Sequence, residues 1–149
     1  MRVQDLSAAD RLAVKSWNYS QELDTYSREE INPNNSAYFA VYDDNVLVGF
    51  GLTGLDAIVQ GMVLNATDLD VGLGLAPKFI RGGRGTEFAQ TVLVHAILLA
   101  KDKGLSHLRC AIHSWNTVSQ LIATQAGFVP SNTIINSAGT FVIMRKEIE

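Results

Sequence analysis

The sequence predicts a mixed α/β fold in which a mostly antiparallel sheet contains one central parallel pair of strands. Two observations carry this prediction. A strand, a long helix and a second strand follow one another through residues 69–112, and pairs of adjacent strands stand on either side of that unit. A strand–helix–strand connection joins parallel neighbours by a right-handed crossover, whereas short turns join antiparallel ones. The 149 residues, 47% of them apolar, suffice for one sizeable core, so we expect a single domain over residues 1–149.

The N-terminal half reads as helices followed by a hairpin. Ser7 has the residue type of an N-cap for a helix from Ala8 to about Leu23, which carries a moderate apolar stripe. The polar residues 24–36 predict a second short helix and a loop. Strands are expected at residues 37–41 and 46–53, because these β-rich runs are separated by Tyr-Asp-Asp-Asn, a composition typical of a tight turn.

The C-terminal half alternates strands and helices. The pattern of residues 56–67 favours neither, but residues 69–75 form a clear strand that Pro77 stops. Helical periodicity runs from Gly85 to Lys103, with Gly104 as the stop. A strand at 105–112, a helix at 117–125 ended by Gly127, and strands at 128–135 and 140–146 complete the chain.

Composition excludes several classes of protein. A net charge of −3 is neither the basic excess of a nucleic-acid binder nor the extreme charge of a disordered chain. The most continuous apolar run, residues 91–100, is about half of the roughly 20 residues that a membrane span needs. The N-terminus has no secretory signal pattern, and the lone Cys110 excludes an internal disulfide and is expected in the core. We therefore expect a cytoplasmic protein with no nucleic-acid or membrane partner.

A glycine-rich loop connects the central strand to the long helix. Residues 77–109 carry 6 basic and 2 acidic side chains in an otherwise acidic chain, and this excess surrounds the segment IRGGRG at residues 80–85. Glycines let backbone N–H groups converge on phosphate oxygens, and the helix start and two arginines add positive charge, so the loop predicts a diphosphate site. Surface charge scatter and a purely structural turn are the alternatives. Neither the P-loop nor the dinucleotide-binding fingerprint is present. In the preceding strand, Gly72 and Gly74 indicate close approach of a ligand or of backbone, which would open a slot beside it.

These motifs resemble those of the GNAT superfamily of acyl-CoA N-acyltransferases. The family's pyrophosphate motif, Gln/Arg-x-x-Gly-x-Gly/Ala, is similar to residues 80–85, although Ile80 departs from the usual first residue. A second block is similar too, with Asn116 after the next strand and a helix that ends in Gly127 and Phe128. The resemblance covers most of the chain, and two blocks in the right order are more specific than one.

The resemblance implies a sheet with helices on both faces that splays at the central parallel pair, with acetyl-CoA in the gap and no metal. A substrate amine, from a small molecule or from a protein N-terminus or lysine, would attack the thioester directly, with a strand N–H stabilising the oxyanion. A homodimer is possible. The residues that it places on acetyl-CoA are Leu73, Gly74, Leu75, Arg81, Gly82, Gly83, Arg84, Gly85, Thr86 and Asn116.

The proton-transfer groups depart from the family pattern. Ala123 stands where a thiolate-protonating tyrosine is common, and Leu69 where some members keep a glutamate base. An acceptor ammonium must lose a proton before it attacks, and the candidates to take it are Asp70, His113 and Asp68. A carboxylate that bonds a neighbouring loop and a histidine that only packs are the alternatives.

The resemblance also implies where the acceptor amine would bind. In the family the N-terminal helical pair forms one wall of that pocket, which places Trp17, Tyr19 and Tyr26 there, although core packing would equally explain Trp17. With Glu22 and Asp24, these aromatic residues would favour a cationic amine. A non-catalytic acyl-CoA sensor is the alternative to an enzyme, and a generic α/β domain with a structural glycine loop is a third interpretation.

Overall fold

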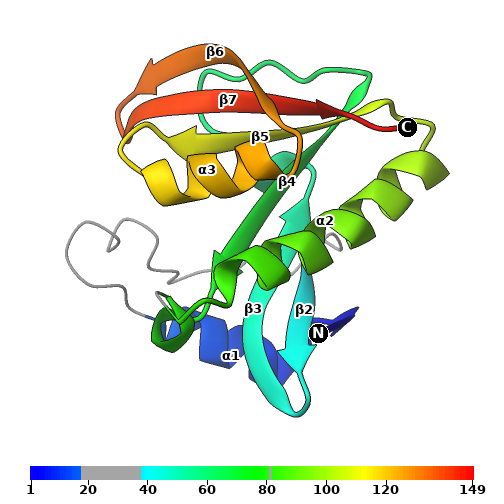
Figure 1. Cartoon of the computed structure of the whole chain (residues 1–149), viewed down its shortest axis with the longest axis vertical. Helices are drawn as coiled ribbons and strands as arrows, with labels where there is room; N and C mark the ends of the chain where they lie inside the picture. Colours follow the sequence, from blue (N-terminus) through cyan, green and yellow to red (C-terminus); the bar gives the residue numbers. More distant parts are fainter. Residues whose placement is uncertain (18–37, 81) are drawn as a thin grey trace. The chain divides into compact units, whose positions relative to one another are not determined.

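The computed structural model describes residues 1–17, 38–80 and 82–149 of the chain (Figure 1). In chain order the elements are β1 (Arg2–Asp5), α1 (Ala8–Lys15), β2 (Tyr38–Asp43), β3 (Val46–Thr53), a 3-10 turn (Leu55–Ala57), β4 (Asp68–Leu75), a second 3-10 turn (Pro77–Phe79), α2 (Gly85–Asp102), β5 (His107–His113), α3 (Thr117–Gln125), β6 (Val129–Asn136) and β7 (Gly139–Glu147). No helix of this described part is long and apolar enough to cross a membrane.

The strands form one mixed sheet, which confirms the predicted fold class. The strand order is β1-β2-β3-β4-β5-β7-β6 over seven strands. The parallel pair joins β4 to β5, as the crossover rule requires for a strand–helix–strand unit, and its register covers three positions from Asp68 with His107 to Asp70 with Arg109. The flanking pairs β1–β2, β2–β3, β5–β7 and β6–β7 are antiparallel.

The described residues fall into two compact units. The first contains residues 1–52 and 73–92, and the second contains residues 53–72 and 93–149. Each unit draws on two separate stretches of the chain. The single domain that the sequence predicts stays a prediction.

In the first unit, helix α1 is shorter than predicted. Ser7 caps it as expected, in a reciprocal capping box in which the Ser7 side chain accepts from the Asp10 N–H and the Asp10 carboxylate accepts from the Ser7 N–H. The helix ends at Lys15, and Ser16 closes its last turn: the Ser16 N–H donates to the Leu12 carbonyl at 3.2 Å and its hydroxyl to the Ala13 carbonyl at 2.6 Å. The rest of the predicted helix, from residue 18 on, lies outside the described residues.

Strand β1 was missed by sequence reasoning. Its four residues contain one apolar side chain, so no alternation marks it as a strand. It pairs with β2 from Arg2 opposite Tyr42 to Asp5 opposite Phe39. The Tyr42 hydroxyl in turn donates to the Asp10 carboxylate, which links β2 to α1.

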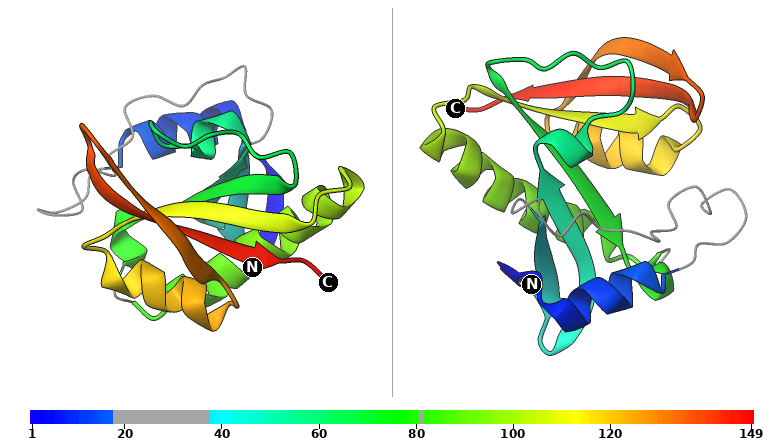
Figure 2. Two further views of the ribbon diagram at one scale, coloured as in Figure 1. Left: turned by 90° about the horizontal axis from the view of Figure 1, so that it is seen from above. Right: turned by 180° about the vertical axis from the view of Figure 1, so that it is seen from behind.

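In the second unit, the segment that connects β3 to β4 crosses one face of the strands β5, β7 and β6, and α3 covers the other face (Figure 2). Arg109 and Ile143 belong to the face under the connecting segment. Leu108 and Met144 alternate with them along the strands, so they belong to the face under α3, and both are buried. Cys110 lies on the same face as Leu108 and Met144, and burial, helped by the charge of Asp70, raises the pKa of its thiol to about 12. The thiol therefore stays protonated, as a packing residue would.

Candidate active site

The glycine-rich loop between β4 and α2 belongs to the first unit. The Gly82 N–H donates to the Phe79 carbonyl at 3.2 Å, and the Arg84 carbonyl accepts from the Phe88 N–H at 3.0 Å as helix α2 begins. Gly83 has a φ of +77°, a conformation that residues with a side chain rarely adopt, and a Cβ built there would meet no atom within 4 Å. The loop thus leaves open space at Gly83, beside the positive end of a helix.

Arg84 has a protein partner in this structure. Its guanidinium forms an ion pair with Asp43, at the end of β2, and lies 5.1 Å from the centre of the Phe79 ring. Both charged side chains keep more than a third of their surface exposed, so the pair contributes little to stability. If Arg84 contacts a phosphate, as the sequence predicts, its guanidinium would interact with both the phosphate and Asp43. Arg81 lies outside the described residues.

Strand β4 passes close to two aromatic side chains. A Cβ at Gly74 would lie 2.3 Å from the Phe50 ring, and a Cβ at Gly49 would lie 2.4 Å from the Phe88 ring and 2.6 Å from the Gly74 carbonyl oxygen. The space beside Gly74 is therefore occupied by Phe50, and the close approach predicted from this glycine is made by a side chain of the protein. On the side of Gly74 where a Cβ would point, the Phe50 ring therefore fills the slot that the sequence predicted.

The remaining cofactor candidates of this unit lie at its surface. Leu73 is 41% exposed, Leu75 is half-buried and Thr86, in the first turn of α2, is exposed. Gly85 is the first residue of α2 and is half-buried. Trp17 stacks at a tilt on Phe50, with 6.1 Å between ring centres, which gives it a packing contact; Tyr19 and Tyr26 lie outside the described residues.

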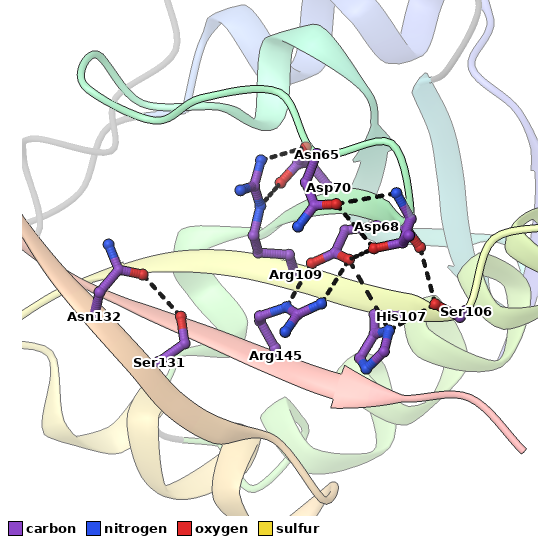
Figure 3. A network of polar contacts seen from close by, with 10 residues as sticks. Asn65, Asp68, Asp70, Ser106, His107, Arg109, Ser131, Asn132 and Arg145 are labelled. Atoms are coloured by element: carbon purple, nitrogen blue, oxygen red, sulfur yellow. Dashed lines mark hydrogen bonds and ion pairs between the residues drawn. The ribbon is translucent and has the colours of Figure 1, made fainter.

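In the second unit, Asp70 is buried and paired with Arg109. The guanidinium donates from Nε to Asp70 Oδ1 at 2.6 Å and from Nη2 to Oδ2 at 3.1 Å (Figure 3). The residues are 4% and 8% exposed, so this is a desolvated, bidentate pair across the parallel strands. Both carboxylate oxygens of the predicted base accept from Arg109, a partner that sequence reasoning missed.

A second pair of the same kind lies next to it. Arg145 donates to both oxygens of Asp68, at 2.6 and 2.8 Å. Burial alone would raise the pKa of the Asp68 carboxyl, but the hydrogen bonds from Arg145 and Thr67 outweigh it and hold the pKa below its usual value. Asp68 is therefore a charged structural group at neutral pH.

The neighbouring Ser106 and His107 do not make a catalytic triad with Asp68. The Ser106 hydroxyl lies 2.7 Å from His107 Nδ1, and Asp68 Oδ1 lies 4.0 Å from the same nitrogen (Figure 3). A triad histidine uses one ring nitrogen for the nucleophile and the other for the carboxylate. With both partners on Nδ1, His107 cannot relay a proton between them.

His113 ends strand β5, four residues beyond Arg109. Its ring stacks on Trp115 with 5.2 Å between centres and tilts against Phe141 at 4.2 Å. Burial lowers the pKa of His113 below its ordinary 6.5, because the apolar surroundings disfavour the imidazolium. At about 3.3 Å per residue along a strand, the Cα atoms of His113 and Arg109 are roughly 13 Å apart, so His113 lies well along β5 from the Asp70–Arg109 pair.

Asn116 caps helix α3. Its side-chain oxygen accepts from the Ser119 N–H at 3.1 Å, which gives the asparagine a local structural role. Gln120, which sequence reasoning missed, donates to the carbonyls of His113 and Ser114 at 3.2 and 3.0 Å and fixes the turn between β5 and α3. Ala123 is buried, so the position where the family often keeps a tyrosine presents a methyl group.

The described residues contain no group of three or more His, Cys, Asp or Glu side chains that could hold a metal ion.

Comparisons with known proteins place the chain in a family. A family model described as acetyltransferase (GNAT) domain matches residues 6–129. No curated protein matches. The solved structure of the aminoglycoside acetyltransferase AAC(6')-Ib with coenzyme A aligns with a TM-score of 0.75 at 15% identity, over 98% of this chain and 94% of that one. The ribosomal-protein-S18-alanine N-acetyltransferase of Escherichia coli aligns with a TM-score of 0.64 at 14% identity, over 99% and 93%.

At these identities the structural likenesses show a shared fold. The family match is stronger evidence, because it extends from the residue before the first capping box to the start of β6. The chain belongs to the GNAT acetyltransferase family.

Proposed function

We propose that the protein transfers the acetyl group of acetyl-CoA to a primary amine by direct attack. The amine nitrogen forms a bond to the carbonyl carbon, the carbon–sulfur bond breaks, and the products are an amide and the CoA thiol. Of the two protons that the ammonium gives up, one goes to the sulfur and one to solvent. The observation that carries the proposal is the open, left-handed Gly83 at the start of α2, directly after the central strand.

The chain's own residues suit the cofactor. Acetyl-CoA supplies the thioester, and its diphosphate is an anion that backbone N–H groups at a helix start bind well. Residues 82–86 would hold the diphosphate, with Arg84 released in part from Asp43, and the backbone of residues 73–75 would bind the pantetheine arm. A Cβ at Gly83 would stand in the space that the structure leaves open there.

His113 suits proton removal better than Asp70. Its lowered pKa keeps the imidazole neutral at pH 7, ready to accept a proton, whereas both oxygens of Asp70 are engaged by Arg109. We assign His113 as the proton acceptor and Asp70 as the residue that positions Arg109.

The acyl-CoA sensor remains a second candidate because of Ala123. A buried methyl group at that position cannot protonate a leaving thiolate. Enzyme and sensor agree on binding and differ in turnover, so a single protein preparation distinguishes them.

The decisive experiment compares two glycines at the two ends of α2. Gly83 and Gly104 both have positive φ (+77° and +71°), and neither would place a Cβ within 4 Å of another atom. Gly83→Val and Gly104→Val therefore impose the same backbone strain. We expect Gly83→Val to weaken acetyl-CoA binding at least about tenfold in calorimetric titration, and Gly104→Val to bind like the wild type.

Thiol release against a panel of amines follows in the same preparation. Binding with turnover supports the transferase, and binding without turnover by any amine supports the sensor. Equal acetyl-CoA affinity in both glycine variants would refute the placement of the diphosphate.

A further inference from the structure

A cavity of about 430 Å³ lies entirely within the second unit. The segment 61–66, which connects β3 to β4, forms one side, and the strands β5, β6 and β7 form the other through Arg109, Asn132, Ile134 and Ile143. This volume is near the lower end of the range for small-molecule sites, about 300–1,000 Å³. It suits a compact molecule.

The segment over the cavity is fixed by its own contacts. The Asn136 side chain donates to the Gln60 carbonyl at 2.8 Å and ties the segment to the end of β6. Gly61, at a φ of +101°, brings its backbone so close to Ile134 that a Cβ would lie 3.0 Å from that side chain. The Met62 N–H donates to the Val59 carbonyl at 3.1 Å. The cavity is thus built by the protein itself.

The polar side chains that line the cavity offer hydrogen-bond donors. Arg109 is the one charged residue among those that line it, all of which are described. Its two bonds to Asp70 come from Nε and Nη2, and among the described residues none accepts from Nη1. The side-chain oxygens of Asn65 and Asn132 accept from Thr67 and Ser131, which leaves both amide NH₂ groups to donate. An ionised carboxylate, which only accepts, is the complementary group.

The rest of the lining is apolar. Met62, Val63 and Leu64 lie on the connecting segment, and Ile134 and Ile143 lie on the strands. Val63 and Leu64 are 79% and 67% exposed, so apolar surface faces water where a ligand would cover it. A ligand for this cavity would combine a carboxylate with a hydrocarbon group.

We infer that this cavity binds a compact carboxylic acid with a branched hydrocarbon group. Arg109, held in place by Asp70, would bind the carboxylate, and the two asparagine amides would add hydrogen bonds. The apolar residues of the lining would cover the hydrocarbon group. The cavity lies within the second unit, so the inference does not depend on the proposed function.

The test uses leucine and two relatives that each lack one group. Calorimetric titration in the presence of CoA compares L-leucine with 3-methylbutylamine, which lacks the carboxylate, and with 4-methylpentanoate, which lacks the amine. We expect leucine and 4-methylpentanoate to bind at least about tenfold more tightly than 3-methylbutylamine, the effect of one charge-assisted hydrogen bond. Equal affinity of all three, or no saturable binding of any, would overturn the inference.

Two neighbouring isoleucines provide a matched pair of variants. Ile134 lines the cavity, whereas Ile135 points to the other side of β6 and is 80% exposed. We expect Ile134→Trp to abolish the binding of leucine and of 4-methylpentanoate, and Ile135→Trp to leave both affinities unchanged. Identical behaviour of the two variants would exclude the cavity as the site.

Acetyl-CoA titration of the wild type separates this inference from the proposed function. No acetyl-CoA binding by the wild type would refute the transferase, whatever leucine does. Intact acetyl-CoA binding with no preference for carboxylates would refute only the assignment of the cavity.

Discussion

Removing either member of the buried Asp70–Arg109 ion pair should lower the stability of the fold. Asp70→Asn removes a charge opposite a buried guanidinium, and loss of one partner of a buried pair typically costs about 3–5 kcal/mol. We expect urea unfolding of Asp70→Asn to show a loss of about 3 kcal/mol. Asp70→Leu combined with Arg109→Met should recover most of it, because no unpaired charge remains.

The same variant tests the predicted catalytic role of Asp70. If the carboxylate only positions Arg109, the acetylation rate per folded molecule falls much less than stability does. A rate that collapses in fully folded Asp70→Asn protein, with acetyl-CoA affinity intact, would restore Asp70 as the base.

If His113 is the proton acceptor, its pKa determines how activity depends on pH. A base must be unprotonated, so activity should be retained above the pKa of His113 and lost as pH falls through it; because burial lowers that pKa, the acid limb should lie below 6.5. His113→Gln should lower kcat/KM about 10²-fold and flatten this limb, while acetyl-CoA affinity stays constant. An unchanged limb in the kcat/KM profile of the variant would assign it to another group.

At the scale of an element, strand β4 depends on Gly74. A methyl group 2.3 Å from the Phe50 ring must displace that ring or the strand, and such overpacking typically costs about 1–3 kcal/mol. We expect Gly74→Ala to lose stability within that range in thermal or urea unfolding. Phe50→Leu should be less harmful in the Gly74→Ala background than in the wild type, and simple additivity of the two changes would contradict the contact.

The sequence predicted individual helices and strands better than it predicted which strands and side chains pair. Helix α3 was predicted at its observed bounds, because apolar periodicity and the stop at Gly127 are local signals. Strand β1 was missed because four largely polar residues become a strand only by pairing with β2. The Asp70–Arg109 pair was missed for a related reason: the residues are 39 positions apart, and only the parallel register brings them together.

At the scale of the whole molecule, the mixed fold and the acetyltransferase family followed from the strand–helix–strand unit and two spaced motifs. The sequence did not determine which residue removes the proton from the amine, because that role depends on burial and on ion pairing. His113 owes its lowered pKa to burial, and Asp70 owes its engagement to an arginine on the next strand. Contacts of this kind are set by tertiary packing, which no local pattern records.

Net charge and local charge make opposite predictions for acetyl-CoA binding. The chain as a whole carries −3, which repels an anion, whereas residues 78–84, in and before the loop, carry three basic side chains (Lys78, Arg81 and Arg84) and no acidic one. At an ionic strength of 0.15 M the Debye length is about 8 Å, so the nearby cations should dominate. We expect acetyl-CoA affinity to fall as sodium chloride is raised in a titration series. Affinity that rises with salt would mean that the overall negative charge governs the encounter.

The raised pKa of the Cys110 thiol has a practical consequence for measuring the reaction. It is the chain's single cysteine, and a pKa of about 12 leaves almost no thiolate at neutral pH. A disulfide reagent added to the native protein should therefore count released CoA with almost no background from the enzyme. After denaturation the same reagent should find one thiol per chain, so a single cuvette would report turnover first and the amount of protein afterwards.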